Sequence, residues 1–311
     1  MSPNLARPPG PDGKPGDDAV GALLKVSAVI PRASRKFTIA TTEAQRRFGL
    51  TLELLTEMVA LGFPVERRDG TEYFESSDLI NLSLYLRTGT NYRTIGRFWP
   101  RALRALEGKV HVGYRFSYVP TCPVSDHAEC RFRILTPSGE FIEREGIGGT
   151  SSPVFTTEIW LRCDWPELPP LVRSLINIAD RYELTWLPAA LRDDTDFMAD
   201  TGLASCKGLA KILTAEGRKR GVEVRQGYGL LTSPPYASIH FWAEAKVDDL
   251  WIPIDPLMIA AMVKWNLLDP ASWSPYRSLG GILCRLALQP TPVVTHDSQR
   301  VDVSFPISRL E

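Results

Sequence analysis

Two stretches of the chain decide its fold: Gly202–Gly229, which reads GLASCKGLAKILTAEGRKRGVEVRQGYG, and His240–Pro256, which reads HFWAEAKVDDLWIPIDP. In the first stretch, apolar residues recur three and four positions apart after a glycine turn, a pattern typical of a helix with one buried face. We expect this helix to carry Cys206 in its first turn and to end near Gly221.

The residues after this helix predict an antiparallel sheet. Residues 222–231, 239–246 and 251–256 read as strands, and Asp248-Asp249 supplies a turn between the last two. Three aromatic residues of these strands are expected in the core: Tyr228, Trp242 and Trp251. The predicted unit is a cysteine-bearing helix that faces a sheet.

The position of Cys206 favours a reactive thiol. In the first turn of a helix, unpaired N–H groups and the positive end of the dipole stabilise a thiolate, and Lys207 adds positive charge. His240 follows 34 residues after Cys206, and Asp255 follows 15 residues after His240. These intervals allow one compact unit to bring the three together. The histidine would then take the thiol proton, and the aspartate would fix the histidine's tautomer.

With Cys, His and Asp in this order and at these intervals, the sequence resembles the transglutaminase-like superfamily, which has the papain-like cysteine-peptidase fold. The resemblance covers Gly202–Pro256 and extends less clearly upstream through Leu171–Leu187. It implies that Cys206 is the nucleophile, His240 the general base and acid, and Asp255 the residue that orients the histidine.

A site of this kind also needs hydrogen-bond donors for the oxyanion that forms during acyl transfer. The backbone N–H of Cys206 is one natural donor, because it lies at a helix N-terminus. A second donor usually comes from a side chain upstream, and Trp186 is the candidate. A tryptophan of the core or of the cleft wall explains Trp186 about equally well.

The N-terminal part of the chain has a different pattern. Residues 1–18 are rich in proline and glycine and are expected to form a disordered tail. Beyond them, residues 41–50, 51–61 and 77–87 predict helices, and residues 64–74 predict a hairpin that turns at Asp69-Gly70. This order is that of a winged helix, and the stretch resembles MerR-type DNA-binding domains. We assign residues 19–108 to a winged-helix-like domain.

The charge of this segment bears on its partner. Between Arg32 and Glu107 there are 12 Lys and Arg against 9 Asp and Glu, a small excess for a domain that binds phosphates. Four arginines fall where a winged helix would touch DNA: Arg46, Arg47, Arg67 and Arg68. We favour docking of a peptide or protein, with DNA as the alternative partner.

The middle of the chain, residues 109–165, alternates in a way that predicts a small β-rich module with its own antiparallel sheet. Cys122, His127 and Cys130 lie close together in the sequence, but a zinc site normally has four ligands in paired spacings. We therefore expect two free cysteines and a loop histidine here, with no metal site. His111 and His296 are expected to be structural.

The composition excludes several classes of protein. The 311 residues carry 36 basic and 36 acidic side chains, which argues against a histone-like or RNA-coating protein. Five cysteines are an odd number, unlike the paired set of a disulfide-stapled secreted domain. No apolar run approaches the ~20 residues that span a bilayer, and no export signal is recognised. We expect a cytoplasmic protein without a membrane partner.

Together these patterns predict an α+β protein. The winged-helix-like domain and the β-rich module precede a papain/transglutaminase-like catalytic domain over residues 166–311. We expect an enzyme without a cofactor that forms an acyl thioester and transfers the acyl group to an amine, as in a biosynthetic pathway. The acyl donor would be a peptide, a carrier protein or a small molecule. The alternatives are a cytosolic cysteine peptidase or amidase, and a DNA-binding regulator whose transglutaminase-like domain senses a ligand.

Overall fold

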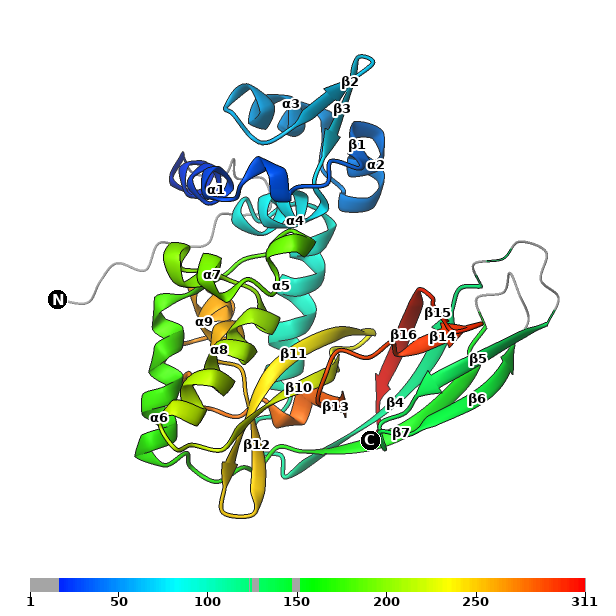
Figure 1. The fold of residues 1–311 in the computed structure, drawn as a ribbon, viewed down its shortest axis with the longest axis vertical. Helices are drawn as coiled ribbons and strands as arrows, with labels where there is room; N and C mark the ends of the chain where they lie inside the picture. Colours follow the sequence, from blue (N-terminus) through cyan, green and yellow to red (C-terminus); the bar gives the residue numbers. More distant parts are fainter. Residues whose placement is uncertain (1–16, 123, 125–128, 147–151, 311) are drawn as a thin grey trace. The chain divides into compact units, whose positions relative to one another are not determined.

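Figure 1 shows the computed structural model, which describes residues 17–122, 124, 129–146 and 152–310. The chain divides into two compact units. The first contains the described residues up to Arg97 together with Glu183–Ser205 and Ala260–Ser272. The second contains Phe98–Tyr182, Cys206–Ile259 and the described residues from Trp273 onward. Two segments of the first unit therefore come from the range 166–311 that the sequence assigns to one domain.

The N-terminal part of the first unit combines helices with a small sheet. Its elements are α1 (Asp17–Val29), β1 (Ile39–Ala40), α2 (Thr41–Phe48), α3 (Leu52–Ala60), β2 (Glu66–Arg68), β3 (Thr71–Phe74), α4 (Ser76–Tyr85) and the first part of α5 (Gly89–Arg104). The strands pair antiparallel in the order β1-β3-β2. This is the helix, helix, hairpin, helix order that the sequence predicts, and membership of a winged-helix family stays a prediction.

Local signals account for these helices. Thr51 caps α3, because its side-chain oxygen accepts a hydrogen bond from the backbone N–H of Leu54. Gly49 ends α2 with φ of 62°, a left-handed conformation that favours glycine. The amphipathic helices then bury their apolar faces with β3 around Leu55 and Phe74, both 0% exposed.

The later segments of the first unit carry β8 (Glu183–Leu184), α7 (Thr195–Thr201), β9 (Leu203–Ala204) and the end of α9 (Pro256–Lys264). The strands β8 and β9 pair in parallel. The side chain of Asn81 in α4 makes two hydrogen bonds to the backbone of Trp186: it donates to the carbonyl at 2.9 Å and accepts from the N–H at 3.0 Å. This pair attaches the segment around Trp186 to α4.

An antiparallel sheet of seven strands forms the centre of the second unit. It contains β4 (His111–Pro120), β7 (Phe155–Arg162), β10 (Val224–Leu231), β11 (Tyr236–Val247), β12 (Leu250–Ile254), β13 (Leu283–Ala287) and β16 (Val303–Arg309). The order is β13-β10-β11-β16-β4-β7, and β12 pairs with the second half of β11. A four-stranded sheet in the order β15-β14-β5-β6 contains β5 (Cys130–Leu135), β6 (Phe141–Gly146), β14 (Val294–His296) and β15 (Gln299–Arg300).

These pairings differ from the small separate sheet expected for residues 109–165. The strands β4 and β7 extend the large sheet through β16, whereas β5 pairs with β14. Both partners come from the C-terminal end of the chain, and alternation within a strand does not reveal which distant strand it will pair with. The expected helical stretch Leu171–Leu187 is shorter: α6 (Pro170–Ile176), then a 3-10 helix over Asn177–Arg181.

The helix α8 (Cys206–Lys219) packs against β10 and β11. The residues that it buries are Gly208, Leu209, Ala210, Leu213 and Gly217. A Cβ on Gly217 would lie 2.7 Å from the Cγ2 atom of Val224, so glycine allows the helix to approach β10 closely. The cysteine-bearing helix expected from the sequence thus lies on the sheet that carries His240.

Candidate active site

Cys206 is the first residue of α8, and its side chain is half-buried. Backbone N–H groups in a first helical turn have no partner within the helix and carry partial positive charge. The neighbouring Lys207 holds its ammonium 5.6 Å from the centre of the Phe241 ring in β11. A thiolate on Cys206 would therefore sit at the positive end of a helix that the sheet anchors.

The hairpin of β11 and β12 determines where His240 and Asp255 lie. The two strands pair with Val247 opposite Leu250, so only two residues form the turn. Continued by one step beyond Ala243 and Ile254, this register sets Asp255 across from Trp242. Residues i and i+2 share a face of a strand. Asp255 and His240 are therefore diagonal neighbours on one face.

A chain of hydrogen bonds links the three residues. The Nε2 atom of His240 lies 2.6 Å from the Oδ2 atom of Asp255, and the imidazole also hydrogen-bonds the Cys206 side chain. Because Nε2 is engaged by the carboxylate, Nδ1 is the nitrogen that can exchange a proton with the thiol. Both His240 and Asp255 are buried, at 6% and 4% exposure.

Asp255 is held at both of its oxygens. The second oxygen, Oδ1, accepts a hydrogen bond from the backbone N–H of Met258 at 3.0 Å, so Asp255 caps the N-terminus of α9. Pro256 follows as the first residue of the helix, a position where proline fits well. The sequence pair Asp255-Pro256 is therefore both a helix start and a fixed carboxylate.

The electrostatics of the site favour a protonated histidine. Burial alone would lower the pKa of His240, but negative charge on Cys206, hydrogen bonds to Asp255 and Cys206, and the charge of Asp255 outweigh it. Together they raise the pKa from 6.5 to about 10. The arrangement can therefore hold a thiolate beside an imidazolium, the ionised form in which a cysteine attacks carbonyl carbon.

Two tryptophans confine the imidazole. Trp242 stacks on it with ring centres 6.4 Å apart and 18° between the planes, and Trp99 of α5 meets it edge-on, also at 6.4 Å. Gly227 lies opposite Trp242 in the sheet, and a Cβ there would lie 2.4 Å from the indole. The sequence placed Trp242 in the core, where it is 1% exposed. Trp99 gives no local signal in the sequence.

A buried carboxylate supports Trp242. The indole N–H donates to Glu244 at 3.3 Å, and Glu244 also accepts from Arg225 at 2.7 Å and lies 3.4 Å from Arg285. Glu244 is 3% exposed, so its two arginine partners compensate for its desolvation. No local pattern in the sequence indicates this group, because its members come from three strands.

The two predicted oxyanion donors, the backbone N–H of Cys206 and the side chain of Trp186, lie in different units. The backbone N–H of Cys206 is at the N-terminus of α8, as expected. Trp186 lies in the first unit, where its backbone is held by Asn81. Its role as a second donor stays a prediction.

The other cysteines have different surroundings. Burial raises the pKa of Cys284 to about 12, and burial also raises the pKa of Cys163 above its usual range. Cys122 and Cys130 lie beside His296: one ligand atom from each falls within 4.8 Å of the other two. His127, which the sequence grouped with these cysteines, lies outside the described residues.

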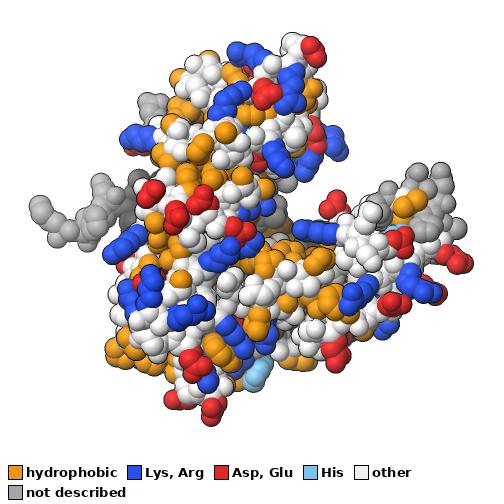
Figure 2. All heavy atoms as spheres, in the orientation of Figure 1, with side chains coloured by type: hydrophobic (Ala, Val, Ile, Leu, Met, Phe, Trp, Pro, Cys, Tyr) orange, Lys and Arg blue, Asp and Glu red, His pale blue; other side chains and the backbone are white. Residues whose placement is uncertain are grey.

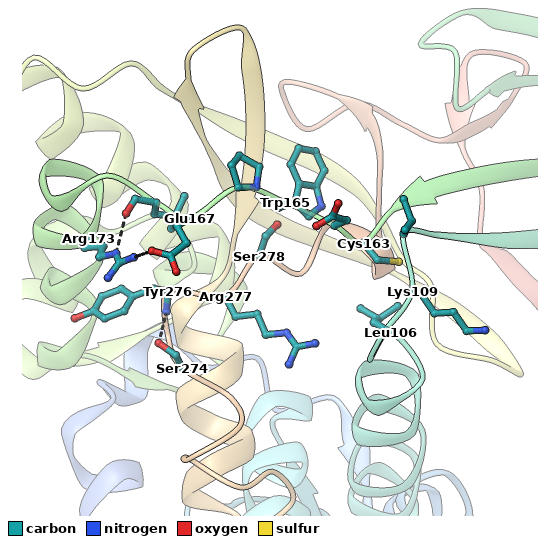
Figure 3. A pocket seen from close by; sticks show the side chains of 15 residues that line it. Leu106, Lys109, Cys163, Trp165, Glu167, Arg173, Ser274, Tyr276, Arg277 and Ser278 are labelled. Atoms are coloured by element: carbon teal, nitrogen blue, oxygen red, sulfur yellow. Dashed lines mark hydrogen bonds and ion pairs between the residues drawn. The ribbon is translucent and has the colours of Figure 1, made fainter.

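A cavity of about 570 Å³ lies elsewhere in the second unit (Figure 3). Its lining mixes cations with aromatic rings, including Lys109, Trp165, Arg173, Tyr276 and Arg277. Within it Arg173 pairs with Glu167 at 2.8 Å. None of Cys206, His240 and Asp255 lines this cavity.

Comparison with known proteins supports a transglutaminase-like domain. Residues 180–256, which include Cys206, His240 and Asp255, match the family model of the transglutaminase-like superfamily. Members of this superfamily are generally cysteine-dependent enzymes, so the match supports a cysteine enzyme in general. No curated protein matches the chain.

Among solved structures, a candidate cysteine protease from Cytophaga hutchinsonii shows a distant likeness to this chain. The match has 11% sequence identity and a TM-score of 0.34, and it covers 65% of this chain and 90% of the other. Among the described residues, no helix has the length and apolar character needed to cross a membrane.

Proposed function

We propose that this protein is a transglutaminase-like cysteine enzyme that forms an acyl thioester on Cys206 and transfers the acyl group to an amine. The observation that carries the proposal is the hydrogen-bonded chain from Asp255 through His240 to Cys206 at a helix N-terminus. A structural cysteine has no need of a buried histidine and carboxylate in this order.

In the first step the Cys206 thiol gives its proton to Nδ1 of His240, and the sulfur attacks the carbonyl carbon of the acyl donor. The oxyanion accepts a hydrogen bond from the backbone N–H of Cys206. The bond between the carbonyl carbon and the leaving group then breaks, and the imidazolium gives its proton to the leaving group. Asp255 keeps the imidazole oriented and stabilises its positive charge throughout.

In the second step a neutral amine attacks the thioester carbon and loses a proton to His240. The C–S bond breaks, an amide forms, and the imidazolium returns its proton to the Cys206 sulfur. Water would give hydrolysis by the same route. Coverage of the imidazole by Trp99 and Trp242 restricts the hydration of the base, which favours a nucleophile that needs less activation than water.

We propose a docking role for the N-terminal winged-helix-like segment, ahead of DNA binding. Three of the four arginines expected to touch phosphates are paired with carboxylates: Arg47 with Glu43, Arg67 with Glu72, and Arg68 with Glu66. On the face drawn in Figure 2, Lys and Arg side chains of this part stand among Asp and Glu side chains. Neutralised arginines contribute less to the counterion release that drives phosphate binding.

p-Nitrophenyl acetate, a general activated acyl donor, tests the enzyme proposal without knowledge of the natural substrate. We expect the intact-protein mass to increase by one acetyl group, the modification to map to Cys206, and C206A to stay unmodified. Primary amines such as glycinamide and cadaverine should speed the loss of the acetyl group and yield the N-acetyl amine.

Each result decides between the candidates. Failure of folded wild-type protein to acylate at Cys206 would overturn the enzyme proposal. Acylation followed by hydrolysis alone, with every amine tried, would replace transfer by a peptidase or amidase reaction. A salt-sensitive shift of random duplex DNA by C206A would favour the regulator instead.

A further inference from the structure

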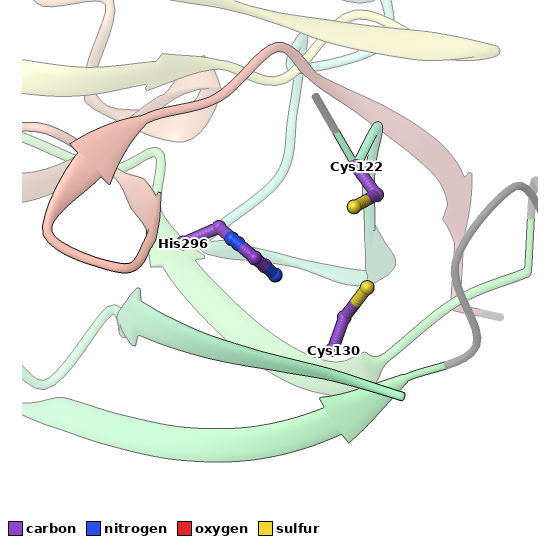
Figure 4. A group of neighbouring side chains, drawn as sticks. All are labelled: Cys122, Cys130 and His296. Atoms are coloured by element: carbon purple, nitrogen blue, oxygen red, sulfur yellow. The ribbon is translucent and has the colours of Figure 1, made fainter. Parts of the chain in front are cut away.

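The group formed by Cys122, Cys130 and His296 has no role in the proposed acyl transfer. Figure 4 shows the two cysteine side chains and the imidazole ring directed toward a common space. Cys122 follows the end of β4, Cys130 begins β5, and His296 ends β14. Two neighbouring segments therefore meet a third one from near the C-terminal end of the chain.

The distances fit a metal ion. One ligand atom of each residue lies within 4.8 Å of the other two. In a tetrahedral zinc site with Zn–S of about 2.3 Å and Zn–N of about 2.0 Å, ligand atoms are separated by roughly 3.3–3.8 Å. Small rotations of the side chains would close this difference. We propose that Cys122, Cys130 and His296 bind a zinc ion that ties the end of β4 to the sheet containing β5 and β14.

The register of the sheet explains why the ligands meet. His296 lies opposite Phe132 in the pairing of β14 with β5, and Cys130 is two residues before Phe132 on the same strand. Residues i and i+2 share a face, so Cys130 and His296 are diagonal neighbours on one side of the sheet. Both are buried there, at 2% exposure each.

The histidine is oriented as a metal ligand. Its Nδ1 atom lies 3.1 Å from the Oδ2 atom of Asp297. A carboxylate that accepts the Nδ1 proton fixes the tautomer in which Nε2 carries the lone pair, an arrangement that recurs around metal-bound histidines. Phe132 meets the imidazole edge-on at 5.4 Å and restricts its rotation.

The donor set selects the type of ion. Two sulfurs and one imidazole nitrogen match zinc and other thiophilic ions, and they exclude magnesium and calcium, which prefer oxygen. Two thiolates neutralise the charge of Zn²⁺, so the loaded group is uncharged in a buried place. Binding breaks both S–H bonds, forms two Zn–S bonds and one Zn–N bond, and releases two protons. Water or another donor completes the tetrahedron.

The experiment measures zinc per chain by mass spectrometry, in protein expressed with added zinc and purified under reducing conditions without chelators. We expect about one zinc per chain in the wild type and at least a tenfold lower content in C122S and in C130S. The matched controls are C163S and C206S, which should keep the zinc. Retention in C206S shows that the ion is not held by the proposed nucleophile.

Two further measurements on the wild-type protein test the proposal even if a cysteine variant fails to fold. Cobalt added to the metal-free wild type should produce thiolate-to-cobalt charge-transfer absorption, and zinc added to it should release about two protons per ion at neutral pH. Removal of zinc by chelator should lower the melting temperature of the wild type and leave that of C122S unchanged.

Three results would overturn the proposal. One is wild-type protein that stays free of zinc after reconstitution, and another is zinc that persists in the C122S/C130S double variant. The third is a disulfide between Cys122 and Cys130, seen as a mass lower by two hydrogens, in protein that also lacks zinc.

Discussion

Cys206 with His240 and Asp255, and Cys130 with His296 and Asp297, each combine a thiol, an imidazole and a carboxylate within the second unit. In the first group the thiol is half-buried at a helix N-terminus, and the carboxylate is 4% exposed. In the second group the thiol is buried on a strand, and the side chain of Asp297 is 76% exposed.

The difference lies in where each group holds charge. The helix N-terminus and the buried carboxylate of the first group stabilise an ion pair between sulfur and imidazole. In the second group, burial and the adjacent Cys122 raise the pKa of the Cys130 thiol. The same three residue types therefore favour a nucleophile in one place and, without an added cation, a neutral Cys130 thiol in the other.

Alkylation gives the largest expected contrast between the two groups. Iodoacetamide at mildly acidic pH should label Cys206 at least about a hundredfold faster than Cys130, because the thiolate is the reacting form. H240A should remove this advantage, whereas H296A should retain it. Peptide mapping by mass spectrometry measures both rates in one chain, and preferential labelling of Cys130 would contradict the comparison.

The titration of His240 is the next largest effect. Because its pKa is raised to about 10, the imidazolium should persist well above pH 6.5 and lose its proton only as the pH approaches 10. In C206A the thiolate charge that helps to raise the pKa is absent, so the midpoint should fall.

Carbon-13 labelling of histidine makes this titration measurable by NMR, since the chain has only four histidines and each can be assigned by substitution. A signal of His240 that titrates near pH 6.5 in the wild type, unchanged in C206A, would show that no ion pair forms.

A smaller effect is expected from the sheet beneath the imidazole. Gly227→Ala sets a methyl group against the indole of Trp242, which stacks on His240. We expect a loss of about 1–3 kcal/mol in the free energy of unfolding in urea, and slower alkylation of Cys206.

Gly21→Ala in α1 is the matched control, because no atom lies within 4 Å of the added Cβ. It should be neutral or stabilise the protein by up to about 1 kcal/mol. Equal free energies of unfolding for the two variants would show that the close contact between Gly227 and Trp242 does not affect stability.

The sequence predicts the parts of the candidate site that depend on local pairing. The position of Cys206 in the first turn of a helix and the turn at Asp248 and Asp249 can be predicted from local patterns in the sequence. The intervals to His240 and Asp255 allow one compact unit to bring the three residues together, and the structure links Cys206 to His240 and His240 to Asp255 by hydrogen bonds.

Contacts between distant segments could not be predicted in this way. Trp99 lies on a helix far upstream of His240, and nothing in its own neighbourhood indicates that it meets an imidazole. His296 joins Cys122 and Cys130 only because β14 pairs with β5. His127 was grouped with these cysteines because it lies between them in the sequence, and spacing along the chain does not show which distant residue joins them.

The two hydrogen bonds of Asp255 have a consequence for mutational scanning. One oxygen orients His240, and the other caps α9. Asn keeps a capping oxygen but loses the negative charge, whereas Ala loses both. A substitution at position 255 therefore has two effects. The loss of turnover in Asp255→Ala combines a chemical defect with a folding defect. Only the difference between the two variants separates these contributions.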